Sequence, residues 1–325
     1  MKVLRYCGFG LLALAILCAL AWACGALTYD GPAPWLAVVQ LVAILAVFIW
    51  VPRWRRKLGI FGAWFALVLT WWLTLRPTNE GDWQPDVAQL AWAEIDGDEV
   101  TVHNVRNCEY RSESDFTPRW ETRRVRLSQL TGVDLAITYW GSPWMAHPIV
   151  SFQFADAPPL CFSIETRKKV GQSYSSIGGL YRQFELIYIA ADERDVIRLR
   201  TNFRKGEEVY LYRSSITPAQ ARERLQEYLR SINGMRDHPR WYNAVTTNCT
   251  TSIRDQHPAA ERMPWDWRLL LNGKADELMH ERRAIATAGL SFAELKRRAL
   301  INPAARAANN APDFSARIRE ARPGM

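Results

Sequence analysis

Three uncharged apolar runs in the first 75 residues constrain the fold of this chain more than any other feature. They cover residues 8–27, 35–51 and 58–75. An α-helix rises about 1.5 Å per residue, so about 20 apolar residues cross the roughly 30 Å hydrocarbon core of a bilayer. The first run has that length, and the other two are just long enough. The sequence therefore predicts three transmembrane helices that form a membrane anchor over residues 1–76.

The positions of the cations predict how the anchor is oriented, because short loops rich in Lys and Arg stay in the cytoplasm. Basic residues precede the first run and fill the loop between the second and the third, at Lys2, Arg5, Arg53, Arg55, Arg56 and Lys57. The only charged residue in the loop 28–34 is Asp30. We therefore expect a multi-pass inner-membrane protein whose C-terminal domain, after Arg76, lies in the periplasm of a Gram-negative cell. The alternative is a cleaved signal peptide over residues 1–24, which the bulky Trp22 disfavours.

The chain after Arg76 has the pattern of one soluble domain of the α+β class. Residues 77–89 are rich in Pro, Gly and acids and suit a linker. Alternating apolar residues predict strands with a hairpin turn at 155–158, and Thr217 followed by Pro218 predicts a helix start. The predicted strands are 99–105, 148–154, 159–165, 184–190 and 208–213. The basic, Ala- and Arg-rich residues 291–325 are expected to form a frayed, solvated tail, with a lipid-headgroup contact as the alternative.

Cysteine usage singles out one thiol. The soluble part holds an odd number of cysteines, so at least one stays free in an oxidising compartment. These cysteines are Cys108, Cys161 and Cys249. If a disulfide forms, we expect it to join Cys108 to Cys161. An unpaired Cys249 would then call for a functional explanation.

The segment WYNAVTTNCTTSIRD, residues 241–255, places Cys249 where a reactive thiol is expected. Thr246, Thr247 and Asn248 are good helix caps, so Cys249 falls in the first turn of a helix. There the helix dipole and the first-turn amides stabilise a thiolate and lower the thiol pKa. The same amides could donate to an oxyanion. Cys249 is the candidate nucleophile, with Asn248 beside it in the substrate site.

Of the five histidines, His147 is the best placed to act as the base. It stands at the start of a predicted strand, and a strand-borne imidazole facing a helix N-terminus suits a papain-type site. The adjacent strand offers Glu165 as the orienting third residue, with Thr166 as the weaker option. The competing interpretation is a structural cysteine and an unrelated histidine.

A histidine on a strand, a polar residue on the next strand and Asn-Cys at a helix start resemble the circularly permuted papain-like fold. Relatives of lecithin:retinol acyltransferase and NlpC-type peptidases share that fold. More closely, the chain resembles the Lnb-type periplasmic domain from about Leu90 to Arg283, which predicts a catalytic domain over residues 90–290. The matching blocks include GVDLAITYWGSPWMAHPIVSFQF, CFSIETRK, WYNAVTTNCTT and WDWRLLLNGKADEL. The resemblance implies that His147 and Cys249 are the catalytic pair, and that Glu165 is the third member.

Members of that family with an assigned activity are lipoprotein acyltransferases. The resemblance therefore implies an acyltransferase or acyl hydrolase that acts on a phospholipid or lipoprotein through a thioester at Cys249. A cysteine peptidase or amidase acting on cell-wall peptides needs the same residues, and a non-catalytic envelope binding module would keep only the fold. An apolar groove beside Cys249 would favour lipid, and an open polar cleft would favour peptide.

Two further residues are candidates for substrate contacts. Arg182 could bind an anionic headgroup and Trp144 could line an acyl groove; alternatively, Arg182 pairs with nearby acids and Trp144 covers the core. The sequence has no CxxC pair, no HExxH and no Gly-rich phosphate loop, so we expect no metal and no nucleotide cofactor. No nucleic-acid partner is expected either.

Overall fold

The computed structural model of the 325-residue chain describes residues 2–256, 264, 266–269 and 272–325. The chain divides into two compact units. The anchor unit comprises Met1–Thr78, Ser173–Glu185 and Trp241–Ala244. The sheet unit comprises Asn79–Gln172, Leu186–Arg240 and Val245–Met325.

The anchor unit contains the three apolar helices α1 (Lys2–Tyr29), α2 (Trp35–Trp50) and α3 (Trp54–Thr74). Among the described residues, Tyr6–Tyr29 and Trp54–Thr74 are long and apolar enough to cross a membrane by length and composition, whereas α2 is a shorter apolar helix. The helices meet at a small apolar cluster formed by Ala23, Leu27, Ala37 and Val68. Large apolar side chains such as Leu67, which is 70% exposed, point away from that cluster. Apolar side chains on the outer surface of a helical group suit contact with lipid.

Residues 173–185 belong to the anchor unit through Arg182. Its guanidinium lies over the Trp72 ring at 3.9 Å and donates to the carbonyl oxygens of Trp72 and Leu75 at 2.6 and 2.8 Å. The backbone N–H of Arg182 and the indole N–H of Trp72 both donate to Oδ2 of Asp30, at 3.0 and 2.7 Å. These bonds join the loop to the ends of α1 and α3.

The sheet unit is a mixed α+β domain, as predicted. Its sheet has the strand order β1-β2-β9-β8-β7-β6-β10, with β5 paired to β2. The strands are β1 (Trp92–Asp96), β2 (Glu99–Arg106), β5 (Trp120–Arg126), β6 (Leu130–Trp140), β7 (Ala146–Phe154), β8 (Leu160–Arg167), β9 (Glu185–Ala191) and β10 (Glu207–Arg213); β3 (Glu109–Tyr110) and β4 (Phe116–Thr117) form a separate pair. β7 and β8 form the predicted antiparallel hairpin, with Ile149 opposite Ser163.

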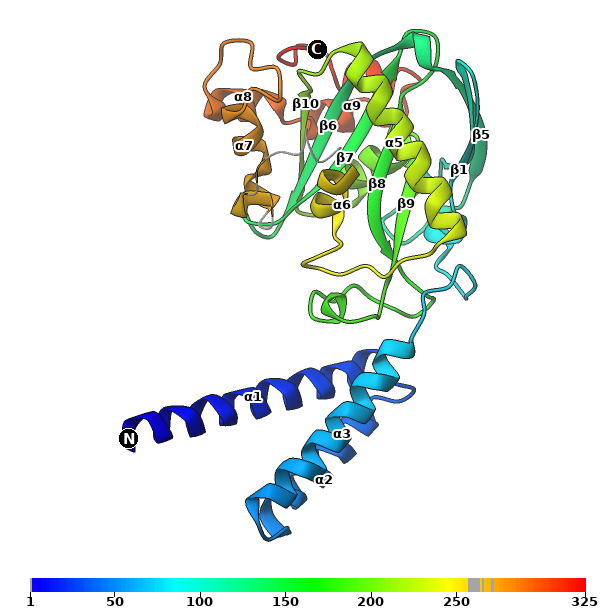
Figure 1. Cartoon of the computed structure of the whole chain (residues 1–325). Helices are drawn as coiled ribbons and strands as arrows, with labels where there is room; N and C mark the ends of the chain where they lie inside the picture. The colour runs from blue at the N-terminus through cyan, green and yellow to red at the C-terminus, as the bar shows by residue number, and fades with distance from the viewer. Residues whose placement is uncertain (1, 257–263, 265, 270–271) are drawn as a thin grey trace. The chain divides into compact units, whose positions relative to one another are not determined.

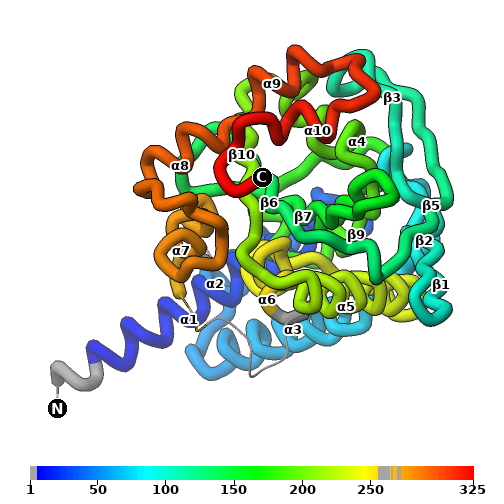
Figure 2. The backbone as a smooth tube through the Cα atoms, turned by 90° about the horizontal axis from the view of Figure 1, so that it is seen from above, coloured from blue at the N-terminus to red at the C-terminus, as the bar shows by residue number. Residues whose placement is uncertain are grey.

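Helices cover both faces of this sheet. α5 (Pro218–Asp237) and α6 (Cys249–Gln256) lie across one face (Figure 1). α4 (Glu193–Arg198), α9 (Asn302–Ala307) and α10 (Phe314–Arg317) lie on the other (Figure 2). The remaining helical elements are α7 (Ala275–Glu281), α8 (Phe292–Ala299), the 3₁₀ helices η1 (Pro85–Val87), η2 (Leu127–Gln129), η3 (Gly178–Leu180), η5 (Trp267–Leu269) and η6 (Asn272–Lys274), and the π-helical turn η4 (Leu199–Phe203).

The start of α5 follows the predicted capping chemistry. Oγ1 of Thr217 accepts from the backbone N–H of Gln220, and the Gln220 side chain accepts in return from the Thr217 backbone. Such a reciprocal cap satisfies two helix N–H groups that have no partner within the helix. Pro218 occupies the first helical position, where a missing N–H costs nothing.

The expectation of a frayed C-terminal tail is wrong. Residues 291–325 form α8, α9 and α10, and the side chains of Leu295, Ile301, Phe314 and Ile318 are fully or almost fully buried. Arg319 donates to Asp134 and Glu193, both of which are buried. Residues 291–325 contain few apolar side chains, but the short helices direct these side chains onto the sheet. The segment is held further by Arg319, which pairs with two buried carboxylates.

Two smaller expectations also change. Part of the expected linker 77–89 packs in the sheet unit, where Trp83 and Val87 are buried. The conditional disulfide between Cys108 and Cys161 is absent, because both are free and buried.

Candidate functional site

Cys249 is the first residue of α6, as the sequence predicts. The cap is Asn248, whose Oδ1 accepts from the backbone N–H groups of Thr250 and Thr251 at 3.0 and 2.9 Å. A capping side chain of this kind fixes the first turn of the helix and with it the Cβ direction of the next residue. Asn248 therefore positions Cys249 through the backbone.

The thiol of Cys249 is buried, with 8% of the residue exposed. Its Sγ lies 3.8 Å from Oγ1 of Thr250, and Nδ2 of Asn272 donates to it at 3.6 Å. Burial raises the pKa of this thiol above its ordinary value, against hydrogen bonds from Thr250 and Asn272 that favour the thiolate. The lowered pKa expected from the helix position alone is wrong for this state of the protein, because desolvation outweighs the first-turn amides.

Asn272 of η6 forms hydrogen bonds with both α6 and β7. Besides the thiol, its Nδ2 donates to Oγ1 of Thr250 at 3.1 Å. Its Oδ1 accepts from the backbone N–H of Ala146 at 2.8 Å. Asn272 thus links the start of α6 to the start of β7, directly beside His147. Sequence reasoning missed this residue, although it lies within one of the blocks that carry the family resemblance.

His147 lies on β7, and its imidazole faces β8. Nε2 is 2.7 Å from Oγ of Ser163, and Ser163 donates to Oε1 of Glu165 at 2.7 Å. Since the single hydroxyl proton goes to the carboxylate, we infer that Nε2–H donates to Ser163 and that Nδ1 is the unprotonated ring nitrogen. Burial, together with the charge of Arg200, lowers the pKa of His147 to about 3, so the ring is neutral at physiological pH.

Glu165 is the carboxylate nearest to His147, at 3.7 Å from Nε2. Its Oε1 also lies 3.5 Å from Nη2 of Arg200, which comes from η4. Burial alone would raise the pKa of Glu165, but the charge of Arg200 and the hydrogen bond from Ser163 hold it well below its usual range. Thr166, the weaker candidate, alternates to the opposite face of β8.

Ser163 was not anticipated as the link between His147 and Glu165. The signal was present in the strand period, since residues two apart in a strand share a face. Ser163 and Glu165 therefore project together toward His147, which the β7–β8 register places across from them.

Cys249 and His147 are not hydrogen-bonded to each other in the structure, although both lie among its described residues. Cys249 contacts Thr250 and Asn272, and His147 contacts Ser163 and Glu165. Their catalytic pairing stays a prediction.

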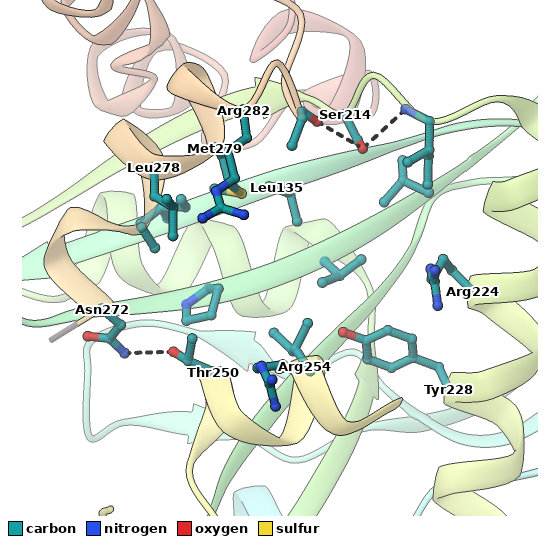
Figure 3. Close-up of a pocket in the computed structure, with 18 of the residues that line it drawn as sticks. Leu135, Ser214, Arg224, Tyr228, Thr250, Arg254, Asn272, Leu278, Met279 and Arg282 are labelled. Atoms are coloured by element: carbon teal, nitrogen blue, oxygen red, sulfur yellow. Dashed lines mark hydrogen bonds between the residues drawn. The ribbon is translucent and has the colours of Figure 1, made fainter. Parts of the chain in front are cut away.

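An apolar pocket of about 490 Å³ opens between the sheet, α5, α6 and α7 (Figure 3). Its floor consists of residues that alternate along β6 and β7: Val133, Leu135, Ile137, Pro148, Val150 and Phe152. Thr250 and Ile253 of α6 and Asn272 of η6 also line it. Its volume is in the range of small-molecule pockets. The residue after Cys249 and the side chain that binds its sulfur both belong to the wall of this pocket.

The other predicted substrate contacts lie elsewhere. Arg182 is engaged within the anchor unit by Trp72 and Leu75. Trp144 is 47% exposed between β6 and β7, where its ring lies 6.2 Å from that of Trp267 and 5.7 Å from the Lys274 ammonium.

The family model of the Lnb N-terminal periplasmic domain matches residues 116–273. This match confirms the resemblance found in the sequence, and it spans His147, Glu165, Cys249 and Asn272. No curated protein matches the chain, and neither does any solved structure.

Proposed function

Residues 116–273 match the family model of the Lnb N-terminal periplasmic domain, and from this match we propose that the chain is a membrane-anchored thiol acyltransferase or acyl hydrolase. Its substrate is a lipid or a lipoprotein, and the acyl group is carried as a thioester on Cys249. The proposal includes a multi-pass location in the inner membrane with the sheet unit in the periplasm, which the apolar helices of the anchor unit and the periplasmic family match support. The permuted papain-like fold is part of this proposal, supported by the chain order of His147, Glu165 and Cys249.

One observation supports the proposal most directly: the first turn of α6 is a wall of the apolar pocket. Asn272 lines the pocket and donates to the Cys249 sulfur, so the thiol lies at its edge. Apolar walls stabilise an alkyl chain by removing it from water, at about 25 cal/mol per Å² buried. A cell-wall peptide, with its many polar groups, would leave its hydrogen bonds unmet on such a surface.

The chemistry follows from the protonation states of the two candidate groups. Nδ1 of His147 accepts the thiol proton, and the sulfur attacks the ester carbonyl carbon of the substrate. First-turn amides of α6 hold the oxyanion while the C–O bond to the leaving alcohol breaks, and the imidazolium returns the proton to that alcohol. An amine or water then attacks the thioester carbonyl carbon and its proton passes to His147. The C–S bond breaks, and the imidazolium returns that proton to the sulfur, which regenerates the thiol.

This step requires the imidazole to reach the sulfur. In the structure His147 binds Ser163, and catalytic hydrogen bonds in substrate-free enzymes are often long or incomplete. Pro148 lines the pocket, and neighbouring residues in a strand point to opposite faces, so His147 is directed to the other face of β7. The proposed pairing therefore requires the start of β7 to rearrange when substrate binds. The neutral ring has a free nitrogen for the proton, but burial makes it a weak base, so the rearrangement must also relieve the desolvation that lowers the pKa of His147.

The burial of Cys249 supports a second candidate, a non-catalytic envelope binding module. A buried thiol with a raised pKa is the ordinary state of a structural cysteine. In that case the pocket binds a lipid without chemical change.

An acyl-adduct experiment separates the two. The full chain is incubated with phospholipid or a diacylated lipopeptide and examined by mass spectrometry. We expect an acyl mass on Cys249 that hydroxylamine removes, that is lost in Cys249→Ser and that persists in Cys108→Ser. If the chain binds lipid but never carries an adduct, the binding module is the function and the acyltransferase proposal is wrong.

A further inference from the structure

The apolar pocket beside Cys249 is also positively charged. Three arginines line it: Arg224 of α5, Arg254 of α6 and Arg282 at the end of α7 (Figure 3). The described lining residues include no aspartate and no glutamate. A pocket with an apolar, low-dielectric lining and positively charged side chains around it attracts an anion. The lining therefore combines an apolar floor with a basic rim.

The arginines differ in how their charges are balanced. Arg224 is held by Glu227 at 2.8 Å. Arg282 is exposed and forms no salt bridge with any residue that the structure describes. Arg254 projects from the same helix that begins with Cys249 (Figure 3). The charge of Arg282 at least is available to a ligand without the loss of an existing ion pair.

Tyr228 gives independent evidence for a ligand. The residue is only 3% exposed, and its ring packs against those of Phe152 and Phe162. Its hydroxyl is buried and has no hydrogen-bond partner among the described residues. The side chain extends from α5 with that hydroxyl directed into the pocket (Figure 3). A buried hydroxyl without a hydrogen-bond partner is destabilising, and an acceptor oxygen on a ligand in the pocket would satisfy it.

We propose that this pocket binds an anionic amphiphile with one acyl chain. The chain lies over the floor of β6 and β7, an oxygen of its acidic group accepts the hydrogen bond from Tyr228, and Arg282 neutralises its charge. As the substrate class of the pocket beside Cys249, this ligand deepens the proposed function. Binding itself needs no thiol, so it can be tested without catalysis.

Two sources supply such a ligand: a free fatty acid, with a carboxylate, and an anionic lysophospholipid, with a phosphate. The test uses full-length Cys249→Ser in nanodiscs of zwitterionic phosphatidylcholine. The probes are diazirine-labelled palmitate, the lysophosphatidylglycerol with the same chain, and the neutral monoacylglycerol as the matched control. Photocrosslinked peptides are located and quantified by mass spectrometry.

We expect one or both anionic probes to crosslink to β6, β7 or α5 and to bind roughly tenfold or more tightly than the neutral probe, with the preference reduced by salt. Palmitate alone would identify a carboxylate ligand, and lysophosphatidylglycerol a phosphate headgroup. Equal binding of the neutral probe, or labelling outside the pocket, would overturn the proposal.

Substitutions complete the test. Tyr228→Phe should weaken anionic binding about tenfold while leaving the melting temperature unchanged or higher, because the hydroxyl has no internal partner to lose. Arg282→Gln should weaken anionic but not neutral binding, and Arg317→Gln on α10 is the control that should change neither. Unchanged anionic binding in both pocket variants would also overturn the proposal. Anionic binding without any acyl adduct on the wild-type chain would uphold this inference while the acyltransferase proposal fails.

Discussion

The imidazole of His147 and the hydroxyl of Ser163 are 2.7 Å apart, and that hydroxyl in turn donates to Glu165. This short relay fixes which ring nitrogen is protonated, because the serine has only one proton to give. Its geometry makes Ser163 a positioning residue for His147 rather than a group that touches substrate.

Replacing Ser163 should therefore disturb the imidazole more than the fold. Ser163→Ala removes the acceptor of Nε2–H and should slow adduct formation on Cys249 by roughly tenfold or more, since the base loses its defined tautomer. It should also cost about 1–3 kcal/mol of stability, because buried polar groups lose a partner. Ser163→Thr keeps the hydroxyl and should retain most of the rate. Equal rates in the Ala and Thr variants would show that the relay is not used.

The pKa of His147 predicts a specific dependence of stability on pH. In the unfolded chain this residue takes up a proton near pH 6.5, whereas in the folded protein its pKa is about 3. Between these values the unfolded state binds more protons, so the free energy of unfolding falls as pH falls, by about 1.4 kcal/mol per pH unit. Above about pH 6.5, His147 no longer makes the free energy of unfolding depend on pH.

His147→Gln should remove this contribution. Thermal melts of the full chain in detergent at pH 7 and pH 5 should show a smaller loss of stability in the variant, by about 2 kcal/mol. Glu165 is ionised in the folded protein throughout this window and mostly ionised in the unfolded chain at pH 5, so its contribution there is small. An identical loss in wild type and variant would mean that the imidazole is already protonated in the folded protein at pH 5.

Local patterns predicted the strands and the helix caps well. Period-2 alternation gave the β7–β8 hairpin, and Thr217–Pro218 gave the start of α5, because both signals act within a few residues. The position of Cys249 at a helix start was predictable for the same reason. The Asn248 cap depends on side chain and backbone only two or three residues apart.

Contacts between distant segments were not predictable in this way. No local pattern near Asn272 predicts its hydrogen bonds with Ala146 and Cys249. Likewise, the Ala- and Arg-rich end of the chain does not predict the ion pairs of Arg319 with Asp134 and Glu193, which lie more than a hundred residues earlier. The thiol pKa was misjudged because burial is a property of the packed domain. The position of Cys249 at a helix start, which lowers the thiol pKa, can be predicted from the sequence. The desolvation that raises this pKa cannot.

Arg319 offers a direct test of the packed C-terminal segment. It joins Asp134 and Glu193, two carboxylates with no exposed surface. Arg319→Ala leaves Glu193 buried without its arginine, while Asp134 keeps its pair with Arg213, and should destabilise the protein by about 3–5 kcal/mol. Arg317→Ala removes an exposed pair with Asp313 and should cost less than about 1 kcal/mol. Urea unfolding of the two variants measures the difference, and similar small losses would indicate that this segment does not pack on the sheet.

The last prediction concerns the reactivity of Cys249 in the protein without substrate. Burial raises the pKa of its thiol, so iodoacetamide should modify it slowly below about pH 8.5, more slowly than an exposed thiol. Cys161, which has no exposed surface, should stay unmodified. The rates are measured by mass spectrometry of the folded chain across a pH series.

Asn272 should contribute measurably to that profile. Asn272→Ala removes the amide that donates to the sulfur at 3.6 Å, and should move the alkylation midpoint to still higher pH. Asn310→Ala, on the exposed surface, is the matched control and should leave the midpoint unchanged. Rapid modification at pH 6.5 would show that the first-turn amides of α6 outweigh burial and that desolvation does not control the pKa of this thiol. A midpoint that does not respond to Asn272→Ala would remove this side chain from the thiol's environment, and with it the link from Cys249 to the strand that carries His147.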